Sequence, residues 1–172
     1  EFGIDKKTQY RLTYTTTTSK TESGTKSLVS ATGNCCWANP SGTQSFSEAY
    51  VTQVYLTATA KNNDCDGGWR WEGYAELYSP DTNTWDRVCT VQVSGSTCQQ
   101  VTNSATCNVT TGKRYTQARV SLTAKHYGYI ELQMKQWKVV TTTTGVTDWQ
   151  DSNTTSAGTV TKTETRTVYR YQ

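Results

Sequence analysis

The sequence predicts an all-β protein, an antiparallel β-sandwich linked by disulfides. Thr is the commonest of its 172 residues, and β-branched and aromatic side chains favour strands. Its mean hydropathy of −0.71 would also suit a disordered chain. Disordered chains, however, are usually rich in charged residues and Pro and poor in aromatics, whereas this one has 18% charged residues, 2 Pro and 11% aromatics. Alternating runs between turn residues, without an apolar stripe of period 3.6, complete the prediction. We expect a single domain over residues 3–172, setting Glu1 and Phe2 aside as a cloning remnant.

The first half of the chain predicts four strands. Residues 10–18 alternate Tyr10, Leu12 and Tyr14 against polar neighbours, and residues 50–61 place small and aliphatic side chains on one face. Residues 19–33 are polar and are expected to form a hairpin end, followed by a cysteine-stapled loop at 34–47. The third strand, 69–78, directs Tyr74 and Tyr78 outward, opposite an inward row of Trp69, Trp71, Gly73, Ala75 and Leu77. The fourth, 85–93, follows a turn at 79–84.

The second half predicts four more strands. Residues 98–110 form a bulged strand, and 112–124 form the most regular one, with Ala118, Val120 and Leu122 inward. A turn at 125–129 leads to a strand at 130–140, which contains a bulge before Trp137. The polar stretch 141–158 connects to a last strand at 159–171, with five Thr on one face. This edge strand is expected to pair with residues 10–18 and so bring the termini together.

The cysteines predict a disulfide framework. Six of them, with no CxxC spacing and one His in the chain, do not suit zinc. The adjacent pair Cys35 and Cys36 is expected to tie one loop to two other places, and Cys98 with Cys107 is expected to be a local bridge. The remaining members of the framework are Cys65 and Cys89. Disulfides indicate an oxidising compartment, so we expect a mature protein that is secreted or on the cell surface, without a signal peptide.

Charge and hydropathy exclude several classes of partner. The net charge is +3 with dispersed Lys and Arg, so no nucleic-acid or membrane-surface footprint is expected. No run of about 18 apolar residues is present, so no membrane span is expected. We expect a monomer. The triplets beginning at Asn108 and Asn153 are glycosylation sequons, relevant only in a eukaryotic source.

An acidic turn predicts calcium as one alternative. Asn62, Asp64 and Asp66 precede Gly67 at alternate positions, as in the first half of an EF-hand-type loop. Gly73 stands where that loop places its last carboxylate, and Glu72 lies one residue earlier. The other alternative is an ordinary Asn/Asp/Gly strand connection.

Aromatic residues predict a ligand surface. Sugar rings stack on exposed aromatic faces, and their hydroxyls need polar partners. Tyr74, Tyr78 and Trp85 are the favoured platform candidates, with Trp37 in the stapled loop added. Trp69 and Trp71 are assigned to the core. Exposed aromatics also serve protein partners.

The chain offers little for catalysis. Glu72 and Glu76 on one strand face could serve glycoside hydrolysis, but residues four apart on a strand lie roughly 13 Å apart at Cα, which is wide for that chemistry. His126 is expected to be a solvated turn residue. No serine-hydrolase, zinc-protease or P-loop motif occurs. We therefore do not expect an enzyme.

Two segments carry a resemblance. The run Thr163-Glu164-Thr165-Arg166-Thr167-Val168-Tyr169-Arg170-Tyr171 resembles a segment of secreted and surface modules of Gram-positive bacteria, which implies an extracellular setting and no activity. Tyr115 at a strand start resembles the tyrosine corner of immunoglobulin-like sandwiches, although no Cys follows two residues later. The sandwich is accordingly expected to be immunoglobulin-like or a jelly roll.

The sequence therefore indicates a secreted binding protein. The first hypothesis is a carbohydrate-binding or surface-adhesion module that takes a glycan or surface polymer on exposed aromatics, with calcium at the acidic turn. The second is a protein-binding effector, such as a protease inhibitor or toxin-like protein, acting through the rigid loop at 34–42. The third is a glycoside hydrolase using Glu72 and Glu76.

Overall fold

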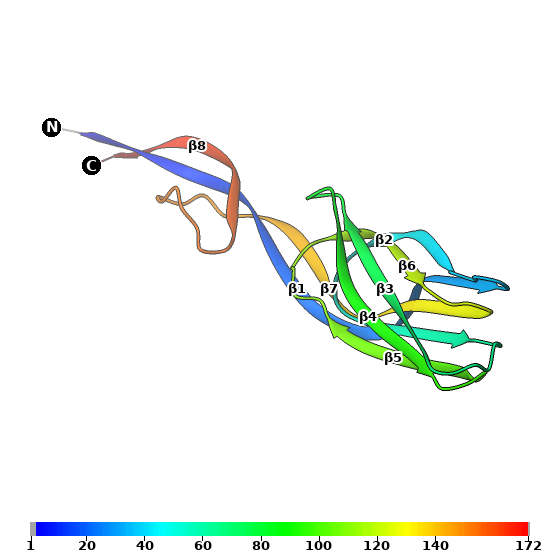
Figure 1. The fold of residues 1–172 in the computed structure, drawn as a ribbon. Helices are drawn as coiled ribbons and strands as arrows, with labels where there is room; N and C mark the ends of the chain where they lie inside the picture. The colour runs from blue at the N-terminus through cyan, green and yellow to red at the C-terminus, as the bar shows by residue number, and fades with distance from the viewer. Residues whose placement is uncertain (1–2, 172) are drawn as a thin grey trace. The chain divides into compact units, whose positions relative to one another are not determined.

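The computed structural model of the protein describes residues 3–171 and confirms the all-β class, with no helix among these residues. The strands are β1 Ile4–Asn34, β2 Ser41–Lys61, β3 Trp69–Ser79, β4 Thr84–Gly95, β5 Gln100–Asn108, β6 Tyr115–Leu122, β7 Tyr127–Val146 and β8 Thr159–Tyr171 (Figure 1). The strands pair antiparallel in β1–β8, β2–β5, β2–β6, β2–β7, β3–β4 and β3–β6. Glu1 and Phe2 lie outside the described residues. Within residues 3–171, no helix has the length and apolarity needed to cross a membrane.

The chain divides into two compact units. The ribbon unit contains the residues up to Lys20 and those from Val140 onward, and the sandwich unit is Thr21–Val139. Both β1 and β7 contribute residues to each unit. A single sandwich domain over residues 3–172 stays a prediction.

The sandwich unit is built from two antiparallel layers that share β2. Residues 41–49 of β2 pair with β6, which pairs with β3 and then β4. Residues 50–61 of β2 pair with β7 on one side and β5 on the other, and β1 lies beyond β7. Within each layer, the paired strands can be followed next to one another in Figure 1. Because β2 passes from one layer to the other, it closes one side of the sandwich.

The core lies between these layers, at the positions that the alternating patterns predicted. The β2 residues Val54, Leu56, Ala58 and Ala60, the β6 residues Ala118, Val120 and Leu122, and the β7 residues Ile130, Leu132 and Met134 are all buried. On β3, Ala75 and Leu77 are fully buried and Trp69 nearly so, whereas Trp71 is half-buried. The predicted bulge before Trp137 is also present, as a shift in the β2–β7 register opposite Gln136.

Two segments predicted as loops are strands. Residues 19–33 belong to β1, and residues 41–47 open β2. The polar β1 segment is stabilised by its neighbour β7: Ser27 Oγ donates to Glu131 at 2.9 Å, and Lys135 Nζ donates to Thr25 Oγ1 at 2.7 Å. Leu28 and Val29 reach the core. The prediction for residues 19–33 was wrong because polar contacts with β7, which leave little apolar signal in the sequence, help to hold this strand. Residues 41–47 were wrongly predicted as a loop because their strand depends on pairing with β6, which sequence spacing does not show.

Four cysteines form two disulfides, Cys65–Cys98 and Cys89–Cys107. The predicted Cys98–Cys107 bridge is wrong, because β5 separates these residues in an extended conformation by roughly 30 Å. The bond from Cys89 on β4 to Cys107 on β5 instead joins the free edges of the two layers, opposite the side closed by β2.

Cys35 and Cys36 do not tie their loop to other parts of the chain. The four remaining cysteines of the sequence are bonded to one another, so no distant partner is left for this pair. Both side chains are exposed. The prediction of two long-range ties from this loop is wrong.

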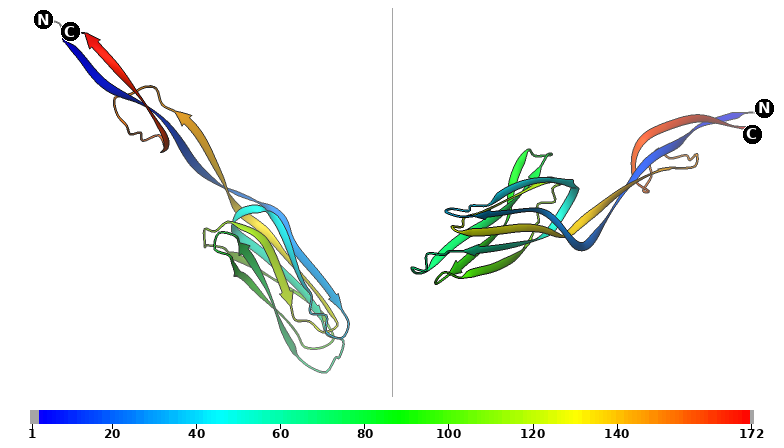
Figure 2. Two further views of the ribbon diagram at one scale, coloured as in Figure 1. Left: turned by 90° about the horizontal axis from the view of Figure 1, so that it is seen from above. Right: turned by 90° about the vertical axis from the view of Figure 1, so that its right-hand side faces the viewer.

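The ribbon unit confirms the predicted pairing of the last strand with the first. The register runs from Ile4 opposite Tyr171 to Thr15 opposite Thr159, with an irregularity at Thr13. Figure 2 shows the outer ends of β1 and β8 side by side in both views. The loop at 147–158 contributes Trp149. The guanidinium groups of Arg11 and Arg166 lie over its ring.

Candidate ligand-binding face

An outward surface of the sandwich unit gathers aromatic and charged side chains on three neighbouring strands. β3 lies between β4 and β6, so each outward β3 residue has a cross-strand neighbour on both sides. Glu76 lies between Arg87 and Arg119, and Tyr78 lies beside Trp85. We call this surface the aromatic face; it consists of Tyr74, Glu76, Tyr78, Trp85, Arg87 and Arg119.

A β-bulge in β4 determines this composition. Cys89 faces the core, yet Arg87 and Trp85, which share its odd numbering, face outward. The β3–β4 register shifts so that Glu76 pairs with Arg87, which leaves Val88 as an extra residue. Because an extra residue reverses the alternation of every side chain beyond it, Val88 directs Trp85 and Arg87 to the same face as Glu76.

Glu76 fixes two guanidinium groups against two aromatic rings. Arg119 Nε donates to Glu76 Oε1 at 2.7 Å, and Arg87 Nε lies 3.6 Å from Oε2. The Glu76 side chain is only 13% exposed, so its ion pair with Arg119 is better shielded from solvent than an ordinary surface salt bridge. Arg87 lies 3.8 Å from the Tyr74 ring centroid and Arg119 lies 4.1 Å from that of Trp85. Two rings and two cations are therefore held together around one carboxylate.

Tyr78 joins the aromatic face to the turn that follows β3. Its ring centroid lies 5.3 Å from that of Trp85 at a tilted angle. Its hydroxyl hydrogen bonds to the side chain of Asn83, which adopts a positive φ of 54° in the turn. Tyr78 is thereby held at both ends of its side chain.

A groove of about 390 Å³ runs beside the aromatic face. It is lined by Tyr74, Arg119, Val120 and Ser121 together with Ser41, Gly42 and Thr43 at the start of β2. Ser41 lies opposite Ser121 and Thr43 opposite Arg119 in the β2–β6 pairing. One tyrosine ring, one guanidinium and three hydroxyls thus line one groove, a set that suits a ligand with both apolar C–H faces and many hydroxyls.

A partly buried polar network is centred on Asp86, which follows Trp85 on β4. Tyr115, fully buried at the start of β6, donates its hydroxyl to Asp86 Oδ2 at 2.7 Å, and its hydroxyl oxygen lies 2.7 Å from Thr111 Oγ1. Lys113 Nζ lies 2.9 Å from the same Asp86 oxygen. Lys113, followed by Tyr115, holds the pKa of Asp86 below its usual range. Burial raises the pKa of Tyr115 to about 12.

This network also bears on the tyrosine-corner resemblance. Tyr115 occupies the predicted place at the start of a strand. Its hydroxyl bonds to the side chains of Asp86 and Thr111, where the immunoglobulin-like corner bonds to backbone. The resemblance therefore extends to position and burial but not to the bonding partner.

Trp37 lies apart from the aromatic face. It belongs to the loop between β1 and β2, where it is 57% exposed. Its ring is 6.2 Å from that of Trp71, edge to face, and Lys125 Nζ lies 5.8 Å from its centroid. Trp69 stacks on Trp71 at 4.5 Å and donates its Nε1–H to Thr97 O at 2.8 Å. Of the four predicted ligand-binding aromatics, three come together and Trp37 does not join them.

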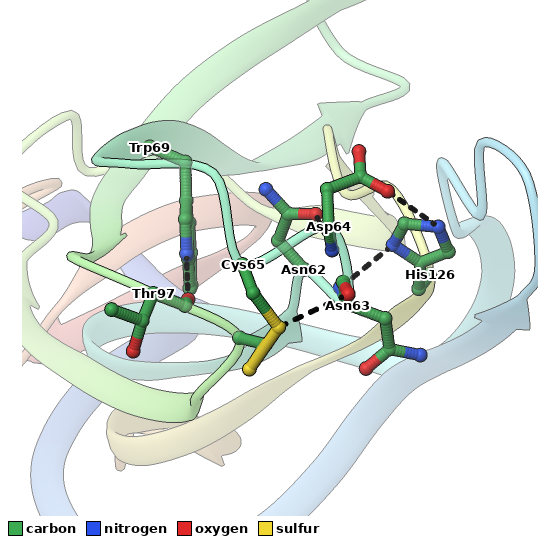
Figure 3. The surroundings of a disulfide bond; sticks show 8 residues. Asn62, Asn63, Asp64, Cys65, Trp69, Thr97 and His126 are labelled. Carbon is green, nitrogen blue, oxygen red and sulfur yellow. Dashed lines mark hydrogen bonds and ion pairs between the residues drawn. A yellow bond between two sulfur atoms is a disulfide. The ribbon is translucent and has the colours of Figure 1, made fainter.

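The acidic turn is organised by hydrogen bonds and ion pairs around the Cys65–Cys98 disulfide (Figure 3). Asn62 Oδ1 accepts the Asp64 N–H at 3.0 Å, and His126 Nδ1 accepts the Asn63 N–H at 2.9 Å. Asp64 forms an ion pair with Lys125, and its Oδ1 lies 3.6 Å from His126 Nε2. The hydrogen bond from Lys125 lowers the pKa of Asp64.

The predicted calcium ligands are spread over this turn and the start of β3. Asp66 is exposed, and Glu72 lies on the outward side of β3 opposite Gln92. Within residues 3–171, no group of three His, Cys, Asp or Glu side chains converges as metal ligands would. Asn and backbone oxygens can also bind calcium, so calcium at this turn stays a prediction.

The carboxylate pair behind the glycosidase hypothesis does not enclose a shared space. Tyr74 lies between Glu72 and Glu76 on the outward side of β3. Both oxygens of Glu76 are engaged by Arg119 and Arg87. This arrangement does not favour acid–base work by the pair on one glycosidic bond.

Sequence reasoning missed the role of two arginines. Arg119 stood outward on the most regular predicted strand, so its position was available from the alternation alone. Arg87 was not predictable, because the extra Val88 reverses the parity of the strand beyond it.

No family model and no curated protein matches the sequence. Among solved structures, the chain is similar to a mannan-recognising family 27 carbohydrate-binding module (TM-score 0.40, 10% identity, 60% of this chain and 67% of that one). It is also similar to a family 28 module specific for non-crystalline cellulose (0.41, 8%, 58% and 66%) and to a family 11 module from Clostridium thermocellum (0.33, 4%, 74% and 95%). The matches thus span about two thirds of the first two modules' own lengths.

Proposed function

We propose that this protein is a non-catalytic carbohydrate-binding module, secreted or displayed on a cell surface, that binds a glycan as a monomer. The observation that carries the proposal is the groove in which the Tyr74 ring, the Arg119 guanidinium and the hydroxyls of Ser41, Thr43 and Ser121 meet. Sugar C–H faces pack on aromatic rings, and sugar hydroxyls exchange hydrogen bonds with hydroxyl and guanidinium groups.

The surroundings of the groove support the same ligand class. Tyr78 and Trp85 extend the aromatic surface beside the groove, so a glycan longer than the groove would meet further rings. Glu76 holds Arg119 in place, which reduces the entropy lost when a ligand orders that side chain. Two disulfides suit an oxidising compartment, where extracellular glycans are found.

The test is a glycan array combined with depletion by insoluble polysaccharides, run with calcium and again with a chelator. We expect retention on at least one polysaccharide. Binding lost with the chelator would support calcium at the Asn62–Asp66 turn, whereas binding unchanged by the chelator would remove calcium. Retention without any hydrolysis, unaltered by Glu72→Gln, is expected of a binding module.

Variants locate the site. Tyr74→Ala removes the ring from the groove and is expected to weaken binding about tenfold or more, since roughly 1.4 kcal/mol corresponds to a factor of ten. Tyr74→Phe keeps the ring and should retain most of the affinity. Trp37→Ala is the matched control, because Trp37 is exposed on a different surface. Full binding by Tyr74→Ala together with loss in Trp37→Ala would refute the groove. No glycan binding at all would refute the function and direct attention to a protein partner.

A further inference from the structure

The loop before β2 carries a pair of adjacent cysteines in an unusual conformation. Cys35 and Cys36 both have positive φ, 54° and 66°, a region that non-glycine residues occupy at a cost. Their Sγ atoms lie 2.6 Å apart, closer than two unbonded sulfur atoms approach. The other four cysteines are bonded to each other. Each member of the pair therefore has the other as its only available cysteine within the chain.

The loop is anchored on both sides of this pair. The Cys35 N–H donates to His126 O at 2.8 Å, and the Ala38 N–H donates to Ala124 O at 2.8 Å. Both acceptors belong to the segment between β6 and β7. The backbone around the two cysteines is thus restrained in the conformation that brings the sulfur atoms together.

We propose that Cys35 and Cys36 close a disulfide between neighbouring residues, and that this bond is a reversible modification site for small thiols and disulfides. In the closing direction, the two thiols exchange with an external disulfide, RSSR. The Cys35–Cys36 sulfur–sulfur bond forms, the RSSR bond breaks, and two RSH molecules leave with the two electrons and two protons. In the opening direction, two RSH molecules reduce the bond and leave as RSSR. The inference does not depend on the carbohydrate proposal.

Geometry and exposure make this bond easier to reduce than the Cys89–Cys107 bond. Neighbouring Cα atoms are about 3.8 Å apart across a trans peptide, whereas disulfides usually join Cα atoms roughly 4.4–6.8 Å apart. The peptide bond here is trans, since the described chain contains no cis bond. Both side chains are exposed, whereas Cys89 of the Cys89–Cys107 bond is buried. Strained and exposed disulfides are the ones that exchange readily with external thiols.

The bond also restrains Trp37, the next residue. Opening the small ring would allow Cys35 and Cys36 to leave the positive-φ region, and Trp37 would then be free to leave its edge contact with Trp71. We expect a change in tryptophan fluorescence when the bond opens.

The test is alkylation of the intact protein, produced in an oxidising secretion pathway, with iodoacetamide. Trypsin cleavage after Lys26 and Lys61 releases a peptide whose only cysteines are Cys35 and Cys36. Without reductant, we expect neither to be alkylated. In a graded series of reduced to oxidised glutathione, both should become alkylated at ratios that leave Cys89 and Cys107 protected. Alkylation of both before any reduction, or only together with Cys89 and Cys107, would overturn the proposal.

Matched variants separate the pair from general unfolding. Cys36→Ser leaves Cys35 without a partner and should make it alkylatable, or glutathione-bound, in unreduced protein. The double Cys35→Ser, Cys36→Ser variant should lose the fluorescence change seen in the wild type under mild reduction. An unchanged fluorescence response in that variant would refute the restraint on Trp37. If a variant does not fold, the order of alkylation in the wild-type protein still decides the proposal.

Discussion

Replacing Tyr115 with Phe should remove the hydrogen bonds of its hydroxyl with Asp86 and Thr111 and almost no volume. The Tyr115 hydroxyl is fully buried and donates to the Asp86 carboxylate at 2.7 Å. A hydrogen bond to a charged group contributes roughly 1.5–3 kcal/mol. Asp86 keeps its ion pair with Lys113, and its side chain is 23% exposed, so water can replace part of the loss. We therefore expect the free energy of unfolding to fall by about 1.5 kcal/mol at pH 7.

The effect of this substitution should depend on pH at both ends of the range. Lys113 and Tyr115 lower the pKa of Asp86, so the stabilisation is present above the unfolded value of about 3.9 and is lost as the pH falls through the folded value. Burial raises the pKa of Tyr115 to about 12, against about 10 when unfolded. That contribution is complete below pH ~10 and is lost as the pH rises towards ~12. Phe does not ionise, so the variant should lack this alkaline loss.

Urea denaturation of the wild type and Tyr115→Phe, followed by fluorescence between pH 3 and pH 11, measures both effects. The difference in unfolding free energy should be largest near neutral pH and should decrease below about pH 4. Thr111→Val serves as a control, since it removes the second partner of the hydroxyl while leaving the bond to Asp86. A loss below about 0.5 kcal/mol at pH 7, or one unchanged down to pH 3, would refute the assigned network.

Three further changes test other parts of the fold. Gly73→Ala should lower the free energy of unfolding by about 1–3 kcal/mol in urea titrations, because the added Cβ would lie 2.8 Å from Ile130 Cδ1; an unchanged midpoint would contradict this packing. Replacing Cys89 and Cys107 together by Ala should cost about 3 kcal/mol, since the bond closes a loop with a separation of 18 residues; a loss under 1 kcal/mol would argue against it as a clasp of the two layers. Trp149→Ala should increase protease cleavage within residues 147–158 of the ribbon unit, because Arg11 and Arg166 stack on that ring at 5.0 and 4.7 Å; unchanged cleavage would remove this role.

The parts of the fold that could be predicted are those in which side-chain alternation is uninterrupted. The strand with Ala118, Val120 and Leu122 is an example, since each inward residue is apolar and each outward one polar. The pairing of β1 with β8 was also predictable, because two Thr-rich alternating segments near the termini suit an exposed two-stranded ribbon.

The failures occurred where cross-strand partners, rather than local pattern, determine the structure. Residues 19–33 look like a loop because their strand is held by polar contacts with β7, such as that of Ser27 with Glu131. The cysteine pairing depends on which strands lie at the edges of the two layers, and sequence spacing carries no such information. The outward position of Arg87 depends on one bulged residue.

The aromatic face was therefore predictable only in part. Tyr74 and Tyr78 followed directly from the parity of β3, and Trp85 from its place near a turn. The pairing of these rings with two arginines around one glutamate needed the register of three strands, which only the structure supplies.

The sharing of β2 between two layers has a consequence for engineering. Its second half supplies inward residues such as Val54 and Leu56 that specify how the strands align, whereas its first half supplies Ser41 and Thr43 to the groove. Because core and groove positions lie on different stretches of one strand, the groove residues can be randomised while the alignment stays fixed. A library limited to Ser41, Thr43 and their neighbour Ser121 would thus vary the proposed binding groove and leave the Arg119–Glu76 ion pair and the scaffold unaltered.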